Sequence, residues 1–306
     1  MSERTPPQPV FVIGAPRSGT TLLAAMMNAH SRFSCGNETH FFECLRDGTA
    51  EYLTDPRHWP KRACAYTSRL KHVGRSIFEL YDVDFADYAK ALESVRPTVA
   101  TVLRCFMECY LARTGKRRWV EKTPGHLKRF TRIRAHFPAS PVICIVRDPR
   151  DVSLSLMRQA WGTRTLLDGI LIWKTYFEYY KKFIVSDKNV LTVKFEDLVQ
   201  DPSEACERIC FFVDEIFEPG MLDTSLSAVG VGSCLEPYKE NAARPVESGR
   251  AFAWRREPRE HDLCIADSLL KRDLRWLGYS LSGASRSAMD RGRMEGIAGL
   301  LRDLSR

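Results

Sequence analysis

The sequence predicts an α/β fold of three layers, in which a central parallel sheet is flanked by helices and carries a helical cap insertion. The first observation is that continuous apolar runs, such as VFVIG at 10–14, alternate with stretches of helical spacing. Such runs are typical of parallel strands buried on both faces. The second is the segment 45–117, which is too long for a simple crossover between two strands. The hydrophobic share of 44% suits one globular domain over residues 1–306.

Strand-and-helix units follow one another along the chain. The first strand ends in Gly14, so a glycine loop leads into the first helix, and Pro124 stands near the first turn of the second helix. Ligands of such sheets bind at the carboxyl ends of the strands, so we expect functional residues just after each strand. The expected strands are 10–14, 118–123, 141–149 and 190–198, and the helices after them are 20–30, 125–136, 150–159 and 203–214.

Three further segments extend this framework. The insertion 45–117 contains a long helical pattern at about 84–114, and we interpret part of the insertion as a cap over the site. Aromatic residues recur at helical spacing in 161–187, which favours core packing over a wall of the substrate pocket. We expect a helical tail at 281–306, in which 289–305 spaces its apolar residues among arginines and predicts an amphipathic helix docked on the domain.

Composition indicates where the protein is located and which charge its ligands carry. Apolar runs stay far below the roughly 20 residues that span a bilayer, and the opening MSERTPPQP lacks the apolar core of a signal peptide. We therefore expect a cytoplasmic protein without a membrane span. The net charge of +8 favours anionic ligands without choosing among them.

The ten cysteines form no C-x-x-C pair. Two pairs, Cys105 with Cys109 and Cys206 with Cys210, have the i,i+4 spacing of one helix face and would need two nearby histidines to form a metal site. Reduced thiols in cytosolic proteins usually behave as small buried hydrophobes. We expect that behaviour here, and no metal.

The stretch VFVIGAPRSGTTLLAAMMNAH at 10–30 indicates an anion site. Gly14 and Gly19 have the spacing of a Walker A loop, but Thr20 stands where that motif has lysine. The cation is instead Arg17, inside the loop. A glycine loop before a helix presents backbone N–H groups and a positive dipole end to an anion, so we expect a P-loop-type fold. The expected anion-binding residues are Arg17, Ser18, Gly19, Thr20 and Thr21.

Two motifs together resemble those of one enzyme family. The loop PRSGTTL resembles the 5′-phosphosulfate loop of sulfotransferases that use 3′-phosphoadenylyl sulfate (PAPS). The stretch 147-RDPRDVSLS-155 resembles the 3′-phosphate motif of the same family, in which an arginine and a serine eight positions later bind one phosphate. The resemblance implies that Arg147 and Ser155 bind the 3′-phosphate, and arginine supplies the forked donors that a dianion needs.

Other stretches narrow the resemblance. The segments 37-NETHFF-42 and 120-VEKTPGH-126 are similar to motifs of glycan sulfotransferases of the heparan type, while the loop is closer to tyrosylprotein and bacterial members. The stretch 248-SGRAFAWRRE-257 resembles the late basic loop that closes over the nucleotide, which implies contacts from Arg250 and Arg255. This loop is longer than the usual form, and Phe195 stands where relatives commonly carry tyrosine.

The resemblance implies sulfuryl transfer from PAPS to a hydroxyl or amine, with adenosine 3′,5′-bisphosphate (PAP) as product. Glu38 matches the general base, and Lys122 and Arg17 match the cations near the transferring group. His40 either orients Glu38, serves as an alternative base, or is structural. Neighbours on a strand face opposite sides, so we expect Lys122 to face the site rather than to pair with Glu121.

Other functions stay open at this point. A P-loop kinase of small molecules needs Mg²⁺ and a lysine over the phosphates, and a nucleotide-binding module without turnover needs no base. Nucleic-acid binding is disfavoured because the basic residues are scattered and no basic run is interleaved with aromatics. The expected acceptor is a hydroxyl of a small molecule, glycan or lipid, and the sequence predicts no oligomeric state.

Overall fold

The computed structural model describes residues 7–231, 242–256 and 260–284. The chain divides into two compact units. The first comprises the residues up to Arg147 together with Thr175–Ala251, and the second comprises Asp148–Lys174 with the residues from Phe252 onward. Residues 281–284 form no helix, and the rest of the expected tail helix lies outside the described residues.

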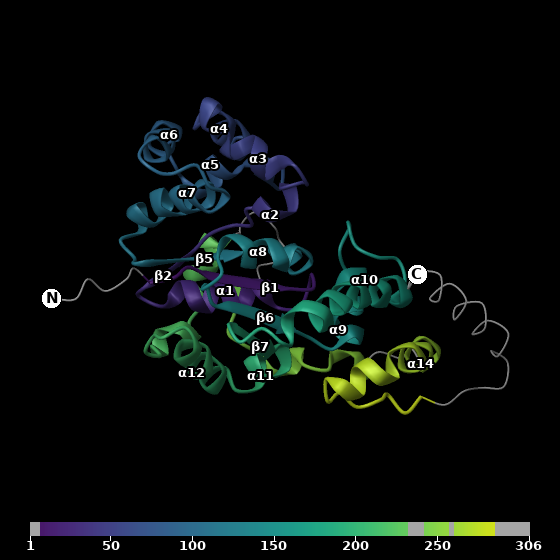
Figure 1. Ribbon diagram of the computed structural model, residues 1–306. Helices are drawn as coiled ribbons and strands as arrows, with labels where there is room; N and C mark the ends of the chain where they lie inside the picture. The colour runs from purple at the N-terminus through teal and green to yellow at the C-terminus, as the bar shows by residue number, and fades with distance from the viewer. Residues whose placement is uncertain (1–6, 232–241, 257–259, 285–306) are drawn as a thin grey trace. The chain divides into compact units, whose positions relative to one another are not determined.

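The first unit contains a five-stranded parallel sheet with the order β2-β5-β1-β6-β7 (Figure 1). The prediction of a central parallel sheet flanked by helices is confirmed. The strand β2, only three residues long, was not predicted from the sequence. The last strand is shorter than predicted, because Phe195–Gln200 form the helix α11. The strands are β1 Val10–Gly14, β2 Phe33–Cys35, β5 Arg118–Lys122, β6 Val142–Val146 and β7 Val190–Lys194.

Aromatic packing joins this sheet to the segments beside it. Phe11 of β1 lies 5.2 Å from Phe137, 5.9 Å from Trp119 and 6.2 Å from Phe42, measured between ring centroids. Apolar side chains of this size dominate core energetics, so these contacts fix the segment around Phe42 on the sheet. The helices of the unit outside the cap are α1 Thr20–Ala29, α8 Phe130–His136, α11, α12 Pro202–Phe212 and α13 Ser227–Gly230.

The expected helix at 125–136 has two parts. Residues Pro124–Arg129 form a 3₁₀ helix, and α8 follows from Phe130. Pro124 begins the 3₁₀ helix, as expected for proline in a first turn. The helices α8 and α12 lie on opposite faces of the sheet (Figure 1).

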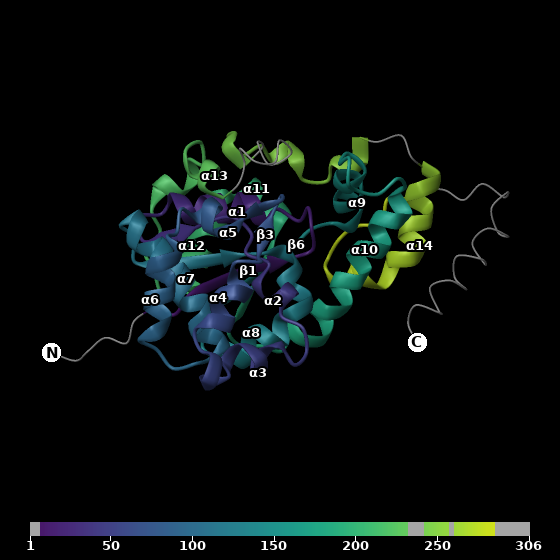
Figure 2. The same cartoon turned by 90° about the horizontal axis from the view of Figure 1, so that it is seen from above.

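The insertion folds as a group of short helices with one small hairpin, gathered on one side of the sheet (Figures 1 and 2). The single helix expected at 84–114 is two helices, because Pro97 lies between them and cannot continue a helix. Thr98 then caps the second one through a capping box with Thr101. The elements are α2 Phe41–Cys44, α3 Thr49–Thr54, the 3₁₀ helix Pro56–His58, α4 Lys61–Thr67, β3 Lys71–His72, β4 Arg75–Ser76, α5 Ile77–Tyr81, α6 Phe85–Glu93 and α7 Val99–Thr114.

The second unit contains α9 Pro149–Met157, most of α10 Leu166–Tyr179, the 3₁₀ helix Ala253–Arg256 and α14 Glu260–Trp276. A π-helical turn, Tyr180–Ile184, follows α10 in the first unit. Within the aromatic segment, Trp173, Tyr176, Phe177 and Tyr180 are buried while Trp161 is exposed, so the stripe serves mainly as core.

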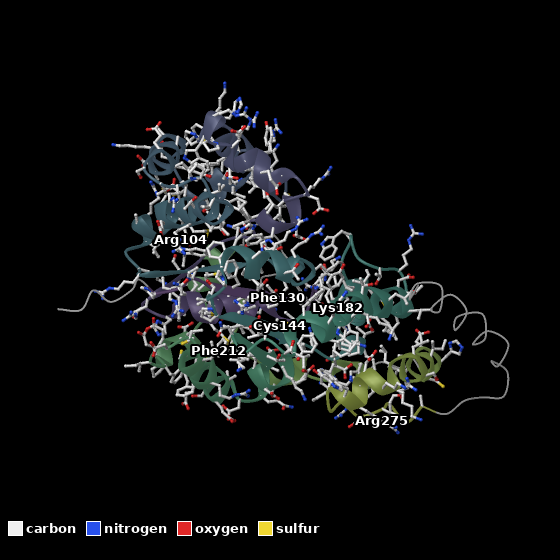
Figure 3. All side chains as sticks on the ribbon, viewed as in Figure 1. Arg104, Phe130, Cys144, Lys182, Phe212 and Arg275 are labelled. Atoms are coloured by element: carbon white, nitrogen blue, oxygen red, sulfur yellow. The ribbon has the colours of Figure 1, made fainter. Side chains whose placement is uncertain are left out.

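The cysteines of the described residues are all free thiols. Cys144, labelled in Figure 3, lies fully buried in the middle of β6, and burial raises the pKa of its thiol far above the ordinary value. The expectation of buried, inert thiols therefore fits this position.

Among the described residues, no helix combines the length and the apolar character that a membrane crossing requires.

Candidate active site

The glycine loop after β1 needs both of its glycines. A Cβ at Gly14 would lie 2.6 Å from the carbonyl oxygen of Ile145 on the neighbouring strand. Gly19 has a φ of 101°, and its Cβ would lie 2.3 Å from the ring of Phe195. A side chain at either position would therefore displace β6 or α11. The close packing fixes the loop at the amino end of α1.

Two residues of the loop have features that are energetically unfavourable in a loop with a purely structural role. Arg17 has a φ of 67°, a left-handed conformation that costs a residue other than glycine about 1–3 kcal/mol. The Ser18 side chain is fully buried, yet within the described part of the chain its Oγ has no hydrogen-bond partner. Buried hydroxyls are normally satisfied, so an oxygen of a bound anion suits this position. Thr20 and Thr21 open α1 directly after the loop.

A buried ion pair lies beside this loop. Lys122 ends β5 with its side chain fully buried, and its Nζ lies 2.9 Å from Oε1 of Glu38. Glu38 follows β2, and its side chain is largely buried. The strand register pairs Lys122 with Val12, so the ion pair lies next to the strand that leads into the glycine loop.

Glu121 faces away from that ion pair. Its Oε2 lies 2.9 Å from Nδ1 of His126, and its Oε1 accepts hydrogen bonds from the hydroxyls of Thr123 and Thr39 at 2.6 and 2.7 Å. Burial alone would raise the pKa of Glu121, but His126 and the hydroxyl donors outweigh it, and the pKa is lowered. Glu121 therefore holds the segment that carries Glu38. The sequence analysis did not assign it this role.

His40 lies on the same side of its segment as Glu38. It has a φ of 53° and stands immediately before α2. Its Nδ1 is hydrogen-bonded to Oε2 of Glu43 at 2.7 Å, and its Nε2 lies 3.9 Å from Oε2 of Glu38. Burial would lower the pKa of His40, but the hydrogen bond to Glu43 and the charge of Glu38 outweigh it, and the pKa is raised.

His72 joins this group from the cap. Its Nδ1 lies 3.0 Å from Nε2 of His40, and its side chain is buried. It stands on β3, and the turn that follows uses Val73 and Gly74 with φ of 50° and 77°. Positive φ at both central residues is typical of a two-residue hairpin turn. The sequence analysis missed His72, because nothing in RLKHVGR indicates that a hairpin directs the histidine towards residue 40.

Arg147 lies at the carboxyl end of β6. Its guanidinium stacks over the ring of Phe195 at 4.1 Å and donates hydrogen bonds to the carbonyl oxygens of Arg17 and Arg250, each at 3.1 Å. Phe195 has no phenolic hydroxyl, but its ring face supports the arginine. The late loop reaches Arg147 through the backbone of Arg250, whose side chain lies 3.8 Å from Glu247.

Two predicted residues belong to the second unit. Ser155 is half-buried on α9, and Arg255 is exposed, with its guanidinium 4.6 Å from the ring centroid of Phe252. The convergence of Arg147 and Ser155 on one phosphate stays a prediction. The same holds for contacts between Arg255 and a nucleotide.

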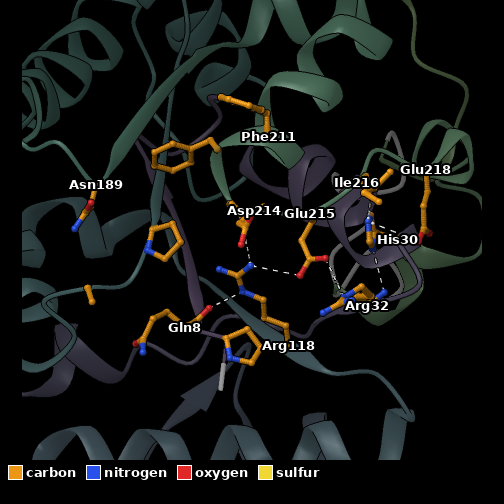
Figure 4. A pocket seen from close by; sticks show the side chains of 15 residues that line it. Gln8, His30, Arg32, Arg118, Asn189, Phe211, Asp214, Glu215, Ile216 and Glu218 are labelled. Carbon is orange, nitrogen blue, oxygen red and sulfur yellow. Dashed lines mark hydrogen bonds and ion pairs between the residues drawn. The ribbon is translucent and has the colours of Figure 1, made fainter. Parts of the chain in front are cut away.

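A large hollow of about 1020 Å³ lies at the other edge of the sheet (Figure 4). Arg118 begins β5 there and donates hydrogen bonds to the carbonyl oxygens of Gln8 and Val213, both at 2.5 Å. Glu215 pairs with Arg32 at 2.9 Å in the same place. Parallel sheets bind their ligands at the carboxyl ends of the strands. The hollow is at the amino ends, so cavity size does not identify the candidate active site, which we infer from Glu38 and Lys122.

Comparison with known proteins agrees with the motifs. A family model described as "Sulfotransferase family" matches residues 9–219. Protein-tyrosine sulfotransferase A of Caenorhabditis elegans is 25% identical over 287 residues, which cover 88% of this chain and 67% of that protein. The nodulation protein NoeE of Sinorhizobium fredii is 28% identical over 168 residues, covering 53% of this chain and 34% of NoeE.

Solved structures share the fold. The sulfotransferase domain of the curacin biosynthetic pathway has a TM-score of 0.61 at 20% identity and covers 91% of this chain and 100% of that domain. The sulfotransferase domain of the Synechococcus olefin synthase has a TM-score of 0.57 at 20% identity. It covers 83% of this chain and 90% of that domain. The P-loop-type architecture expected from the glycine loop is confirmed. Because the family model spans more than half of the sequence, the chain belongs to the sulfotransferase family, whose members transfer sulfuryl groups.

Proposed function

We propose that the protein transfers a sulfuryl group from PAPS to a hydroxyl or amine of an acceptor, with Glu38 as the general base and without a catalytic metal. The observation that carries this proposal is the Lys122–Glu38 ion pair of 2.9 Å, which lies beside the glycine loop. A base and a cation next to an anion-binding loop are the groups that this transfer requires.

The residues of the loop suit the donor. The buried Oγ of Ser18 and the amino end of α1 suit the phosphosulfate end of PAPS, together with Arg17, Gly19, Thr20 and Thr21. Arg147 and Ser155 are proposed to bind the 3′-phosphate, and Arg250 and Arg255 to close over the nucleotide. PAPS supplies the activated sulfuryl group, and PAP remains as product.

Separate side chains of the protein are proposed to remove the acceptor proton and to stabilise the charge of the leaving group. Lys122 pairs with Oε1 of Glu38, Oε2 lies 3.9 Å from Nε2 of His40, and we propose that Oε2 takes the acceptor proton. General-base catalysis of this kind contributes about 10²–10⁴-fold. The ammonium of Lys122 and the guanidinium of Arg17 stabilise negative charge that develops on the leaving group. Glu43 orients His40, which places an imidazole against Glu38.

The acceptor class follows from the hydroxyl chemistry and from the relatives. One relative is named for protein tyrosine, which is a phenolic hydroxyl, and NoeE is named for nodulation. A hydroxyl of a small molecule, a glycan, a lipid or a tyrosine side chain is therefore the acceptor to test. The cap helices α3–α7 are the part of the first unit that we propose contacts it.

The experiment uses labelled PAPS with a panel of hydroxylated metabolites, glycans and tyrosine peptides, in the presence of excess chelator. We expect label transfer to at least one acceptor class. ATP consumption that requires Mg²⁺, without transfer from PAPS, would instead identify a P-loop kinase. PAP binding without any transfer would identify a module that binds the nucleotide without turnover.

Substitution of the base then tests the mechanism. Glu38→Gln should lower transfer by about 10²–10⁴-fold while PAP affinity stays within a factor of a few. Glu207→Gln is the matched control, since Glu207 is an exposed carboxylate of α12, outside the cap. Wild-type turnover in Glu38→Gln would remove Glu38 as the base. Arg147→Ala should weaken PAP binding, and unchanged affinity would contradict the 3′-phosphate assignment.

A further inference from the structure

Three side chains, one of which belongs to the ion pair, meet in an arrangement that extends beyond what the transfer reaction requires. They are Glu38, His40 and His72, and one ligand atom from each lies within 4.8 Å of the others. His40 Nε2 is 3.0 Å from His72 Nδ1 and 3.9 Å from Glu38 Oε2. Two imidazole nitrogens and one carboxylate oxygen form a donor set that transition metals bind.

The geometry points to a site for one divalent transition-metal ion, Zn²⁺ or Co²⁺ by its ligand chemistry, formed by Glu38, His40 and His72. Zinc–nitrogen bonds of roughly 2.0–2.1 Å place two tetrahedral ligands about 3.3 Å apart. The separations of 3.0 and 3.9 Å bracket that value and all three pairs lie within 4.8 Å, so side-chain rotations that replace the His40–His72 hydrogen bond complete the site. Imidazole ligands favour Zn²⁺, Co²⁺ and Ni²⁺ over Mg²⁺ and Ca²⁺.

The surroundings support metal binding in a second, independent way. Metal-ligating histidines usually donate their other ring N–H to a carboxylate, which fixes the tautomer. Glu43 accepts such a bond from Nδ1 of His40 at 2.7 Å, so Nε2 is left to face the metal. Lys122 engages Oε1 of Glu38 and leaves Oε2 towards His40.

The site has a consequence for activity that rests on the proposed function. A metal ion on Oε2 of Glu38 occupies the lone pair that would take the acceptor proton. The metal is therefore an inhibitor that the cap hairpin helps to hold through His72. Metal binding itself does not depend on the proposed function, so the two are tested separately.

The binding experiment uses the full chain without a polyhistidine tag, stripped with chelator and titrated with Co²⁺. We expect one ion per chain, a d–d absorption band of a low-coordinate site without a thiolate charge-transfer band, and displacement by Zn²⁺. His72→Asn should weaken binding by at least 10-fold, and Glu43→Gln, which leaves all three ligands in place, by about 10–100-fold. Thermal unfolding of each variant reports whether it is folded.

Two control variants separate this site from other donors. His58→Asn removes an exposed imidazole that also contacts a carboxylate, Asp55 at 3.1 Å, and should leave affinity unchanged. Cys44→Ser removes the exposed thiol next to Glu43 and should also leave it unchanged. Absence of stoichiometric binding, or full affinity in folded His72→Asn, overturns the site.

The activity experiment follows with PAPS and an accepted hydroxyl. Zn²⁺ should inhibit the wild-type enzyme reversibly, and excess chelator should restore the rate. Residual activity of His72→Asn should need at least 10-fold more Zn²⁺ for the same inhibition. Metal binding without inhibition would overturn the inhibitory role while leaving the site, and absence of transfer in metal-free enzyme would count against the proposed function instead.

Discussion

Two copies of the tripeptide Asp-Pro-Arg allow one prediction to be worked out in full. In both, the arginine makes the same forked contact with the aspartate two residues before it. Arg150 donates from Nε and Nη2 to Asp148 at 2.9 and 2.7 Å, and Arg57 donates in the same way to Asp55 at 3.0 and 2.9 Å. The two sites differ in burial: the side chain of Arg150 is 0% exposed and that of Arg57 is 83% exposed.

Arg150 also joins several parts of the second unit. It donates to Asp267 at 3.2 Å and to the carbonyl oxygen of Ser280 at 2.7 Å, and its guanidinium lies 3.7 Å from the ring of Trp254. Arg150→Ala removes the guanidinium that pairs with the buried Asp148 carboxylate, and loss of one member of a buried ion pair costs about 3–5 kcal/mol. At about 2 °C for each kcal/mol in a chain of this size, the unfolding midpoint should fall by roughly 6–10 °C.

The assay is thermal and urea unfolding followed by circular dichroism, with Arg57→Ala as the matched control. Arg57→Ala should leave the midpoint within the error of the measurement, because solvent replaces its contacts. Arg150→Lys keeps the charge but loses the fork, so its midpoint should lie between wild type and Arg150→Ala. Equal shifts for Arg57→Ala and Arg150→Ala would refute the reasoning that burial decides the magnitude.

Two other changes test the loop and the support beneath the base. Gly19→Ala places a methyl group against the Phe195 ring at positive φ, so it should destabilise by about 1–3 kcal/mol and weaken PAP binding; Gly48→Ala, at a φ of 75° in open space, is the control and should cost less. Glu121 has a lowered pKa in the folded state, so its contribution is present above its ordinary value of 4.5 and is lost as the pH falls through the lowered folded pKa. Glu121→Gln should therefore lower stability at neutral pH by about 3–5 kcal/mol and flatten the acid limb of the stability–pH curve; an unchanged acid limb would contradict this assignment.

The alternation of apolar runs with helical spacing was sufficient to predict four strands of the sheet. Of these, β1 and β6 are fully buried runs rich in β-branched residues, whereas β5 carries three charged residues and β7 is mostly half-buried. The strand β2 carries no such signal, because FSC is short and owes its pairing to Arg118–Val120 of the neighbouring strand. The fourth strand was predicted to be too long because the helix after it begins without a break in the apolar pattern. Val190–Lys194 alternates like a strand, but the two acidic residues after Phe195 favour the first turn of a helix.

For the site, sequence reasoning identified residues that follow strands directly. Lys122 ends β5, and Glu38 is three residues beyond β2, so the parallel topology brings them to one edge of the sheet. His72 and Glu121 were missed for different reasons. His72 depends on the path of a hairpin within the cap, which periodicity does not determine. Glu121 is one position from Lys122, and only the structure shows its three partners on the opposite face.

Backbone conformation gives a last, independent reason to place the chemistry at this edge. Arg17 and His40 both have positive φ, where glycine would avoid a cost of about 1–3 kcal/mol for each residue. Neither side chain is needed to fill a core, since neither belongs to the buried set. Their side chains carry a cation and an imidazole, the groups that a loop for an anion and a base for a hydroxyl would use. Positive φ does not by itself mark the site, because Val73, Asp82, Asp214 and Phe252 share it. Under the proposed function, the strain at Arg17 and His40 is retained because each position uses a side chain that glycine does not have.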